Sequence, residues 1–164
     1  MDIYSGSRLR VEEKVFTLPN GKQRKKVVVY PGHAAIMLPI EGDTCVLIRQ
    51  YRFVIGEYIY EAPAGMLNKG ETAIECAHRE LIEEARLDAK TLIPHGFIWT
   101  TPGFTDEKIY LFEARDFTPS DEYPMDEDEI IEVVRVPIPE VWEMIRDGRI
   151  CDAKTIAIIA RCLG

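Results

Sequence analysis

Charged residues between positions 71 and 84 have a spacing that suits metal chemistry. Glu71 is followed by Arg79-Glu80 and then by Glu83-Glu84. On a helix that advances about 100° per residue, Glu80, Glu83 and Glu84 project from one face, where like charges repel. A divalent cation would reverse that repulsion, and the hard oxygen atoms of carboxylates suit Mg2+ or Mn2+. The pattern predicts a cation-binding helix face, although a Glu-Glu doublet alone is more often a solvated surface.

A helix is predicted to position these carboxylates. Its start fits a capping box at residues 72–75, where the Thr72 hydroxyl would accept a hydrogen bond from a free amide of the first turn and Glu75 would reach back. Apolar residues then recur at steps of three or four, which predicts one buried stripe made of Ile74, Ala77, Leu81 and Ala85.

The remaining elements indicate an α/β fold. Turn residues at 19–22 join the first two predicted strands into a hairpin. Mixed strands and helices predict an α/β or α+β sandwich with helices packed on a mixed sheet, and the length of 164 residues fits one domain, 1–164. Strands are predicted at 8–18, 25–30, 34–40, 45–49, 57–61, 92–100, 108–114 and 130–136, and helices at 139–147 and 153–162.

Composition and missing motifs exclude several classes of function. The formal charge of −8 argues against sequence-independent binding to nucleic-acid phosphates, and no apolar run approaches the roughly 18 residues needed to span a membrane. We expect a cytoplasmic protein whose four cysteines are reduced thiols. The three histidines and four cysteines form no local zinc motif, and phosphate-binding glycine loops and serine-hydrolase elbows are missing.

The segment 65–87 resembles the Nudix box. It matches the box at every charged position and departs at Arg86, where the box has a glycine that leaves the helix with φ > 0. Arginine can adopt that conformation at a cost of roughly 1 kcal/mol. Pro102 lies 15 residues past the box, as in the ADP-ribose pyrophosphatase branch of Nudix hydrolases. Other segments that resemble this branch are 49–52, 61–65, 101–107 and 152–155.

The resemblance implies a Nudix α/β/α sandwich with a mixed β-sheet and an N-terminal antiparallel β-hairpin. It implies Mg2+-dependent hydrolysis of the diphosphate of ADP-ribose to AMP and ribose 5-phosphate, with Mn2+ as a substitute metal. Enzymes of this branch are commonly homodimers whose N-terminal strands, here within residues 1–30, cross to the partner. By the same resemblance, the Ala64 carbonyl, Glu80 and Glu84 hold the ions, Glu83 binds a water or a shared ion, and Arg79 braces the carboxylates.

The residue that accepts the proton of the attacking water is left open. Glu83 is close to the metal ligands, but members of this branch often take the base from an acidic loop between later strands. That loop corresponds to residues 126–129, where Glu127 is the first candidate and Glu129 the second. The alternative for each is a solvated acidic turn.

Three residues outside the box are candidate substrate contacts. Arg52 would contact a phosphate or ribose, Phe104 would stack on a base, and Glu107 would accept from a ribose hydroxyl; each is alternatively an ordinary structural residue. Two other functions stay open: hydrolysis of another nucleotide sugar or dinucleotide, such as GDP-mannose or NADH, and non-catalytic sensing of ADP-ribose. The three retained carboxylates of the helix disfavour the sensor.

Overall fold

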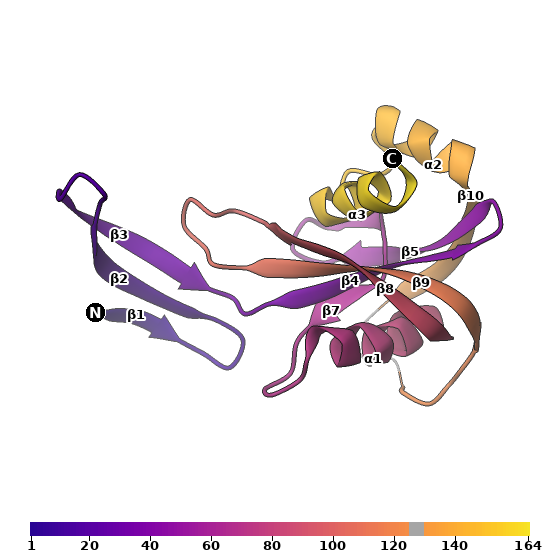
Figure 1. The fold of residues 1–164 in the computed structure, drawn as a ribbon, viewed down its shortest axis with the longest axis horizontal. Helices are drawn as coiled ribbons and strands as arrows, with labels where there is room; N and C mark the ends of the chain where they lie inside the picture. The colour runs from indigo at the N-terminus through magenta and orange to yellow at the C-terminus, as the bar shows by residue number, and fades with distance from the viewer. Residues whose placement is uncertain (125–129) are drawn as a thin grey trace.

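The computed structural model describes residues 1–124 and 130–164. These residues form two β-sheets and three helices (Figure 1). The N-terminal sheet has the order β1-β2-β3 and holds β1 (Asp2–Ser5), β2 (Arg10–Thr17) and β3 (Gln23–Tyr30). The larger sheet has the order β10-β5-β4-β9-β8, with β6 paired to β5 and β7 paired to β4. Its strands are β4 (Ala34–Glu41), β5 (Thr44–Arg52), β6 (Glu57–Glu61), β7 (Ala64–Met66), β8 (Leu87–Trp99), β9 (Lys108–Pro119) and β10 (Ile131–Pro137).

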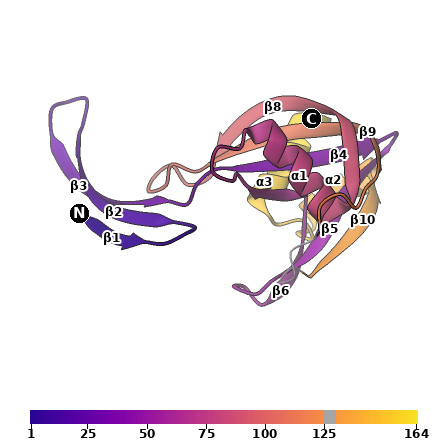
Figure 2. The ribbon, with the colours of Figure 1, turned by 90° about the horizontal axis from the view of Figure 1, so that it is seen from below.

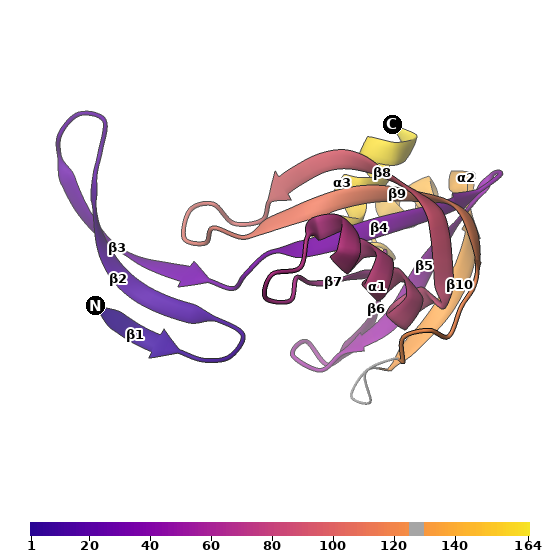
Figure 3. The ribbon, with the colours of Figure 1, turned by 60° about the horizontal axis from the view of Figure 1, so that its bottom comes forward.

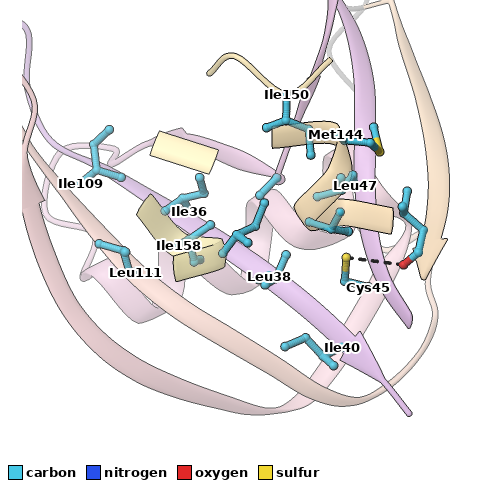
Figure 4. Packing of buried hydrophobic residues seen from close by; sticks show 14 of the residues in the cluster. Ile36, Leu38, Ile40, Cys45, Leu47, Ile109, Leu111, Met144, Ile150 and Ile158 are labelled. Carbon is cyan, nitrogen blue, oxygen red and sulfur yellow. Dashed lines mark hydrogen bonds between the residues drawn. The ribbon is translucent and has the colours of Figure 1, made fainter. Parts of the chain in front are cut away.

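The larger sheet separates two apolar cores, so strand β4 is buried on both faces. Ile36 and Leu38 pack in the core formed with α2 (Ile138–Arg146) and α3 (Ala153–Leu163), which Figure 4 shows from close by. Ala35 and Met37, which alternate with them, pack against α1 (Ala73–Ala85) in the second core. Figures 2 and 3 show α1 on one side of the sheet and α3 on the other. The predicted α/β/α sandwich with a mixed sheet is therefore confirmed.

The N-terminal sheet stands away from the larger sheet (Figures 1 and 3). Strands β2 and β3 form the predicted antiparallel hairpin, and β1 adds a third antiparallel strand that the sequence pattern did not indicate. The connection between β8 and β9 reaches this sheet, because the Val29 amide donates a 2.8 Å hydrogen bond to the Phe104 carbonyl. Apolar side chains on the sheet, such as those of Val15 and Val27, are exposed.

Helix α1 begins as its capping box predicts. The Thr72 hydroxyl accepts from the Glu75 amide, and the Glu75 carboxylate accepts from the Thr72 amide. The predicted stripe is correct for its last three members, which are buried, but wrong for Ile74, which is 51% exposed. Ile74 lies in the first turn, and the buried part of the helix begins only at Cys76.

Two boundaries around α1 differ from the prediction. The short strand β7 lies between the predicted strand 57–61 and the helix, where no strand is predicted, because residues 64–66 pair with β4. Strand β8 begins at Leu87 rather than Leu92, because Arg86 caps α1 in the left-handed region (φ 57°) and directs the chain straight into the sheet. No helix among the described residues has the length and apolarity that a membrane crossing requires.

Candidate active site

Arg79 is the centre of a carboxylate cluster on α1. Its Nη1 atom donates to Glu80 Oε1 and to Glu83 Oε2, both at 2.7 Å. Its Nε and Nη2 atoms donate to the two carboxylate oxygens of Glu71 at 2.8 and 3.0 Å. Nη2 also donates to the Met66 carbonyl at 3.1 Å, which joins the helix to the end of β7. One guanidinium therefore fixes three of the predicted carboxylates in a single arrangement.

The β7 segment lies directly beside two of these glutamates. Glu84 is 2% exposed and accepts a 2.7 Å hydrogen bond from the Ala64 amide. The Glu80 carboxylate lies against Gly65, where a Cβ atom would overlap it. Glycine is required here because the carboxylate occupies the space of a side chain. Helix α1 and β7 thus hold Ala64, Glu80 and Glu84 together, as Figure 3 shows for the two elements.

The charge balance of this cluster suits a cation. Glu71, Glu80, Glu83 and Glu84 contribute four carboxylates, and Arg79 is the guanidinium that pairs with three of them. The hydrogen bonds from Arg79 hold the pKa of Glu71 below its ordinary value, and those accepted by Glu71 and Glu80 hold the pKa of Arg79 above its own. Oxygen donors with this excess of negative charge fit a hard divalent cation such as Mg2+.

A second charged group is buried beside the end of β6. Glu61 is 1% exposed and accepts two hydrogen bonds from Arg52, at 2.7 and 3.0 Å. It also pairs with Lys154 at the start of α3. Burial tends to lower the pKa of Arg52, but the hydrogen bonds and charge of Glu61, together with the charge of Glu84, raise this pKa on balance. Arg52 therefore stays positive within the field of the α1 carboxylates.

The remaining substrate candidates lie in the connection between β8 and β9. Phe104 is 53% exposed and lines a cavity of about 530 Å3 between this connection and strands β2 and β3. Arg24, Lys26 and Tyr30 of β3 also line this cavity. Glu107 accepts a 2.7 Å hydrogen bond from the Thr100 hydroxyl. Phe104 therefore lies beside the N-terminal sheet, whereas the hydrogen bond of Glu107 is within the connection between β8 and β9.

The assignment of the base to the acidic segment 126–129 stays a prediction. Glu127 and Glu129 lie outside the described residues. The sequence pattern indicates Glu61 only as part of the segment 61–65, whereas in the structure it lies between Arg52 and Lys154 and links β5, β6 and α3 as a buried residue. In the sequence, Glu61 and Lys154 lie in the two family-like segments 61–65 and 152–155. Sequence spacing could not show that they meet, because they are 93 residues apart.

The family described as NUDIX domain matches residues 31–157. The chain belongs to this family. Its match includes α1 with the Arg79 cluster, β7 and the Arg52–Glu61 pair, and the chain is a Nudix hydrolase. The N-terminal sheet lies before the matched residues.

Curated relatives match over most of this Nudix hydrolase. ADP-ribose pyrophosphatase of Bacillus subtilis (strain 168) is 34% identical over 155 residues, which cover 93% of this chain and 84% of the relative. GDP-mannose pyrophosphatase of Cronobacter sakazakii (strain ATCC BAA-894) is 35% identical over 136 residues, which cover 78% of this chain and 71% of the relative. A crystal structure described as ADP compounds hydrolase superimposes with a TM-score of 0.86 at 24% identity, covering 98% of this chain and 88% of that chain. This likeness shows that the whole fold, including the N-terminal sheet, is shared.

Proposed function

We propose that this Nudix hydrolase cleaves the diphosphate of ADP-ribose in the presence of Mg2+, giving AMP and ribose 5-phosphate. The observation that carries this proposal is the α1 face, where Arg79 orders Glu80 and Glu83 beside Glu84 and the Ala64-Gly65 backbone. Similarity to an ADP-ribose pyrophosphatase over 93% of the chain supports the choice of substrate.

In this proposal the Ala64 carbonyl, Glu80, Glu83 and Glu84 hold the Mg2+ ions. Bound Mg2+ supplies charge neutralisation of the diphosphate oxygens and lowers the pKa of a coordinated water. Arg79 has a positioning role, because its three carboxylate partners would otherwise repel one another. The proton of the attacking water is taken by Glu83 or by the acidic segment that contains Glu127 and Glu129.

For substrate binding we propose that the cavity beside Phe104 takes the nucleotide. Its lining joins an exposed aromatic ring to the cationic side chains of Arg24 and Lys26, which suits a flat base with nearby phosphates. Arg52 is already paired with Glu61, so its role is to add positive charge near the diphosphate. Glu107 would accept from a ribose hydroxyl.

We also propose that the whole chain is one domain whose N-terminal strands complete a homodimer. The N-terminal sheet exposes apolar side chains such as Val15, Phe16 and Val27, and burial against a partner would remove them from water. Light scattering at micromolar concentration tests this assembly, and a monomer would contradict it. The cytoplasmic location stays a prediction.

The substrate is tested by measuring phosphate-ester products from ADP-ribose, GDP-mannose and NADH with and without Mg2+. We expect turnover of ADP-ribose that depends on the metal and exceeds the other two. Faster cleavage of GDP-mannose would favour the second candidate, which the Cronobacter sakazakii relative supports. ADP-ribose binding without turnover of any compound would indicate a sensor and contradict the proposed reaction.

A further inference from the structure

A second group of potential metal ligands lies on the opposite face of the sheet from α1. It consists of His95 in β8, Glu113 in β9 and Cys162 in α3. Among the residues that the structure describes, these three side chains bring one ligand atom each within 4.8 Å of the others. Glu113 is paired with Leu38 in the parallel ladder of β9 and β4, and Leu38 faces the α2 and α3 core.

The distances between these atoms are close to those of a tetrahedral site. The Nε2 atom of His95 lies 3.2 Å from Oε2 of Glu113. For zinc with nitrogen, oxygen and sulfur ligands, bond lengths near 2.0–2.3 Å place neighbouring ligand atoms about 3.4–3.6 Å apart. Shifts of about 1 Å in flexible side chains would therefore bring all three atoms onto one ion.

Arg115 orients the carboxylate for this arrangement. Its Nε atom donates to Glu113 Oε1 at 2.5 Å, and its Nη1 atom donates to the Ile40 carbonyl at 3.4 Å. The bond to Oε1 leaves Oε2 directed at His95. A partner that fixes one oxygen of a ligating carboxylate while the other faces the ion is a common outer-shell arrangement in metal sites.

We propose that His95, Glu113 and Cys162 form a metal site for a divalent transition ion such as Zn2+, separate from the α1 carboxylates. Imidazole and thiolate ligands prefer Zn2+ over Mg2+, whereas the all-oxygen set on α1 prefers the harder ion. Three protein ligands leave a fourth position for water, and the partial exposure of His95 gives the ion a route from solvent.

The chemistry of Cys162 argues against a redox role for the same group. Burial and the charge of Glu113 raise the pKa of this thiol to about 12, so the side chain is not a reactive thiolate. A bound cation would displace the thiol proton and hold the sulfur as a ligand.

An ion in this position would fasten the end of α3 to β8 and β9. The start of the same helix is held by Lys154 and Thr155, which contact Glu61 and the Ala62 amide. The ion would then stabilise the docking of α3 without touching the α1 face. The effect that we expect is therefore an increase in thermal stability.

The test uses the full chain, stripped of metal with a chelator and titrated with Co2+ and then with Zn2+. Co2+ bound to a thiolate gives a sulfur-to-metal charge-transfer band in the near ultraviolet, which oxygen ligands do not produce. We expect this band in the wild type and in Cys151→Ser, whose cysteine is exposed and outside the cluster. The band should disappear in Cys162→Ser, and Zn2+ affinity should fall by about 10-fold or more in Cys162→Ser and in His95→Gln.

A thermal measurement keeps the proposal testable if Cys162→Ser folds poorly. Zn2+ should raise the Tm of the wild type and of Glu84→Gln, but not that of His95→Gln. No charge-transfer band in the wild type, or a band retained in Cys162→Ser, would overturn the proposal. Because none of these readouts is enzymatic, failure here is distinguishable from failure of the proposed reaction.

Discussion

The Glu84 carboxylate accepts a hydrogen bond from the Ala64 amide across 2.7 Å, which ties the buried side of α1 to β7. Glutamine in place of Glu84 keeps an oxygen that can accept this bond but removes the negative charge. We expect Glu84→Gln to fold normally by circular dichroism and to lose metal-dependent turnover by at least about 100-fold. Glu143→Gln, which alters an exposed side chain of α2, is the matched control. Unchanged turnover in Glu84→Gln would contradict the metal assignment.

Gly65→Ala should weaken metal binding without changing any ligand. The added Cβ overlaps the Glu80 carboxylate, so Glu80 must move away from Ala64. The Mg2+ concentration for half-maximal activity should rise by about 10-fold. Gly103→Ala is a suitable comparison, because its Cβ would meet nothing within 4 Å. Gly103 lines the cavity proposed for the nucleotide, so its substrate affinity can change while its Mg2+ requirement should match the wild type. Equal Mg2+ requirements in the two variants would argue against Glu80 as a ligand.

Arg86 has a strained backbone conformation and a side chain that forms a hydrogen bond to a distant carbonyl. Its φ of 57° favours glycine, while its Nη1 atom donates to the Tyr123 carbonyl at 2.9 Å. Arg86→Ala loses the hydrogen bond and keeps the strain, whereas Arg86→Gly loses the bond and relieves the strain. Urea unfolding should therefore show Arg86→Gly to be more stable than Arg86→Ala by about 1 kcal/mol. The reverse order would show that the turn is not strained.

The buried Glu61 is expected to contribute much more to stability than an exposed glutamate in a similar pair. Glu61→Ala leaves Arg52 without its bidentate partner in a partly buried site, and the free energy of unfolding should fall by about 3–5 kcal/mol. Glu41→Ala removes the partner of Arg135 at the surface and should cost less than about 1 kcal/mol. Both values can be measured by chemical denaturation. Similar losses in the two variants would contradict the burial argument.

Acid should remove the stabilisation that Glu71 provides. Its pKa is lower in the folded state, chiefly because of the hydrogen bonds from Arg79, so the unfolded chain binds a proton more readily. The stabilisation is complete above the ordinary carboxyl pKa of about 4.3 and is lost as the pH falls through the folded value. The stability difference between wild type and Glu71→Gln should therefore be larger at pH 7 than at about pH 3. A difference that is the same at both pH values would contradict this coupling.

The parts that could be predicted from the sequence are local ones. The capping box and the repeat of Ala77, Leu81 and Ala85 place α1 correctly. Both patterns are local, because the capping residues and the buried side of a helix are determined by residues a few positions apart. The pairing of Arg79 with Glu83 fits the i, i+4 spacing of a helix, whereas its pairing with Glu80 was expected only from the resemblance to the Nudix box. The exposure of Ile74 does not follow from the periodicity, because it depends on how the first turn of α1 packs against the rest of the chain.

Contacts between distant segments could not be predicted in this way. Glu61 and Lys154 meet across 93 residues. His95, Glu113 and Cys162 come from three elements, and no local motif joins them. Local spacing therefore predicted no zinc site, and only the packing of α3 on β8 and β9 brings these three side chains together. Strand β1 was also not predicted, because four residues are too few to show the alternation of apolar and polar side chains that indicates a strand.

The parallel pairing of β4 with β9 has a consequence for how the protein folds. Ala34 is paired with Ile109, so the centre of the larger sheet joins segments 75 residues apart. Closing such a loop is entropically costly and slow compared with forming a helix or a hairpin. Helix α1 lies between these two strands in the sequence, so it can pack fully only after the sheet that contains both of them has formed. During synthesis the carboxylate face of α1 would therefore be completed only after β9 has left the ribosome.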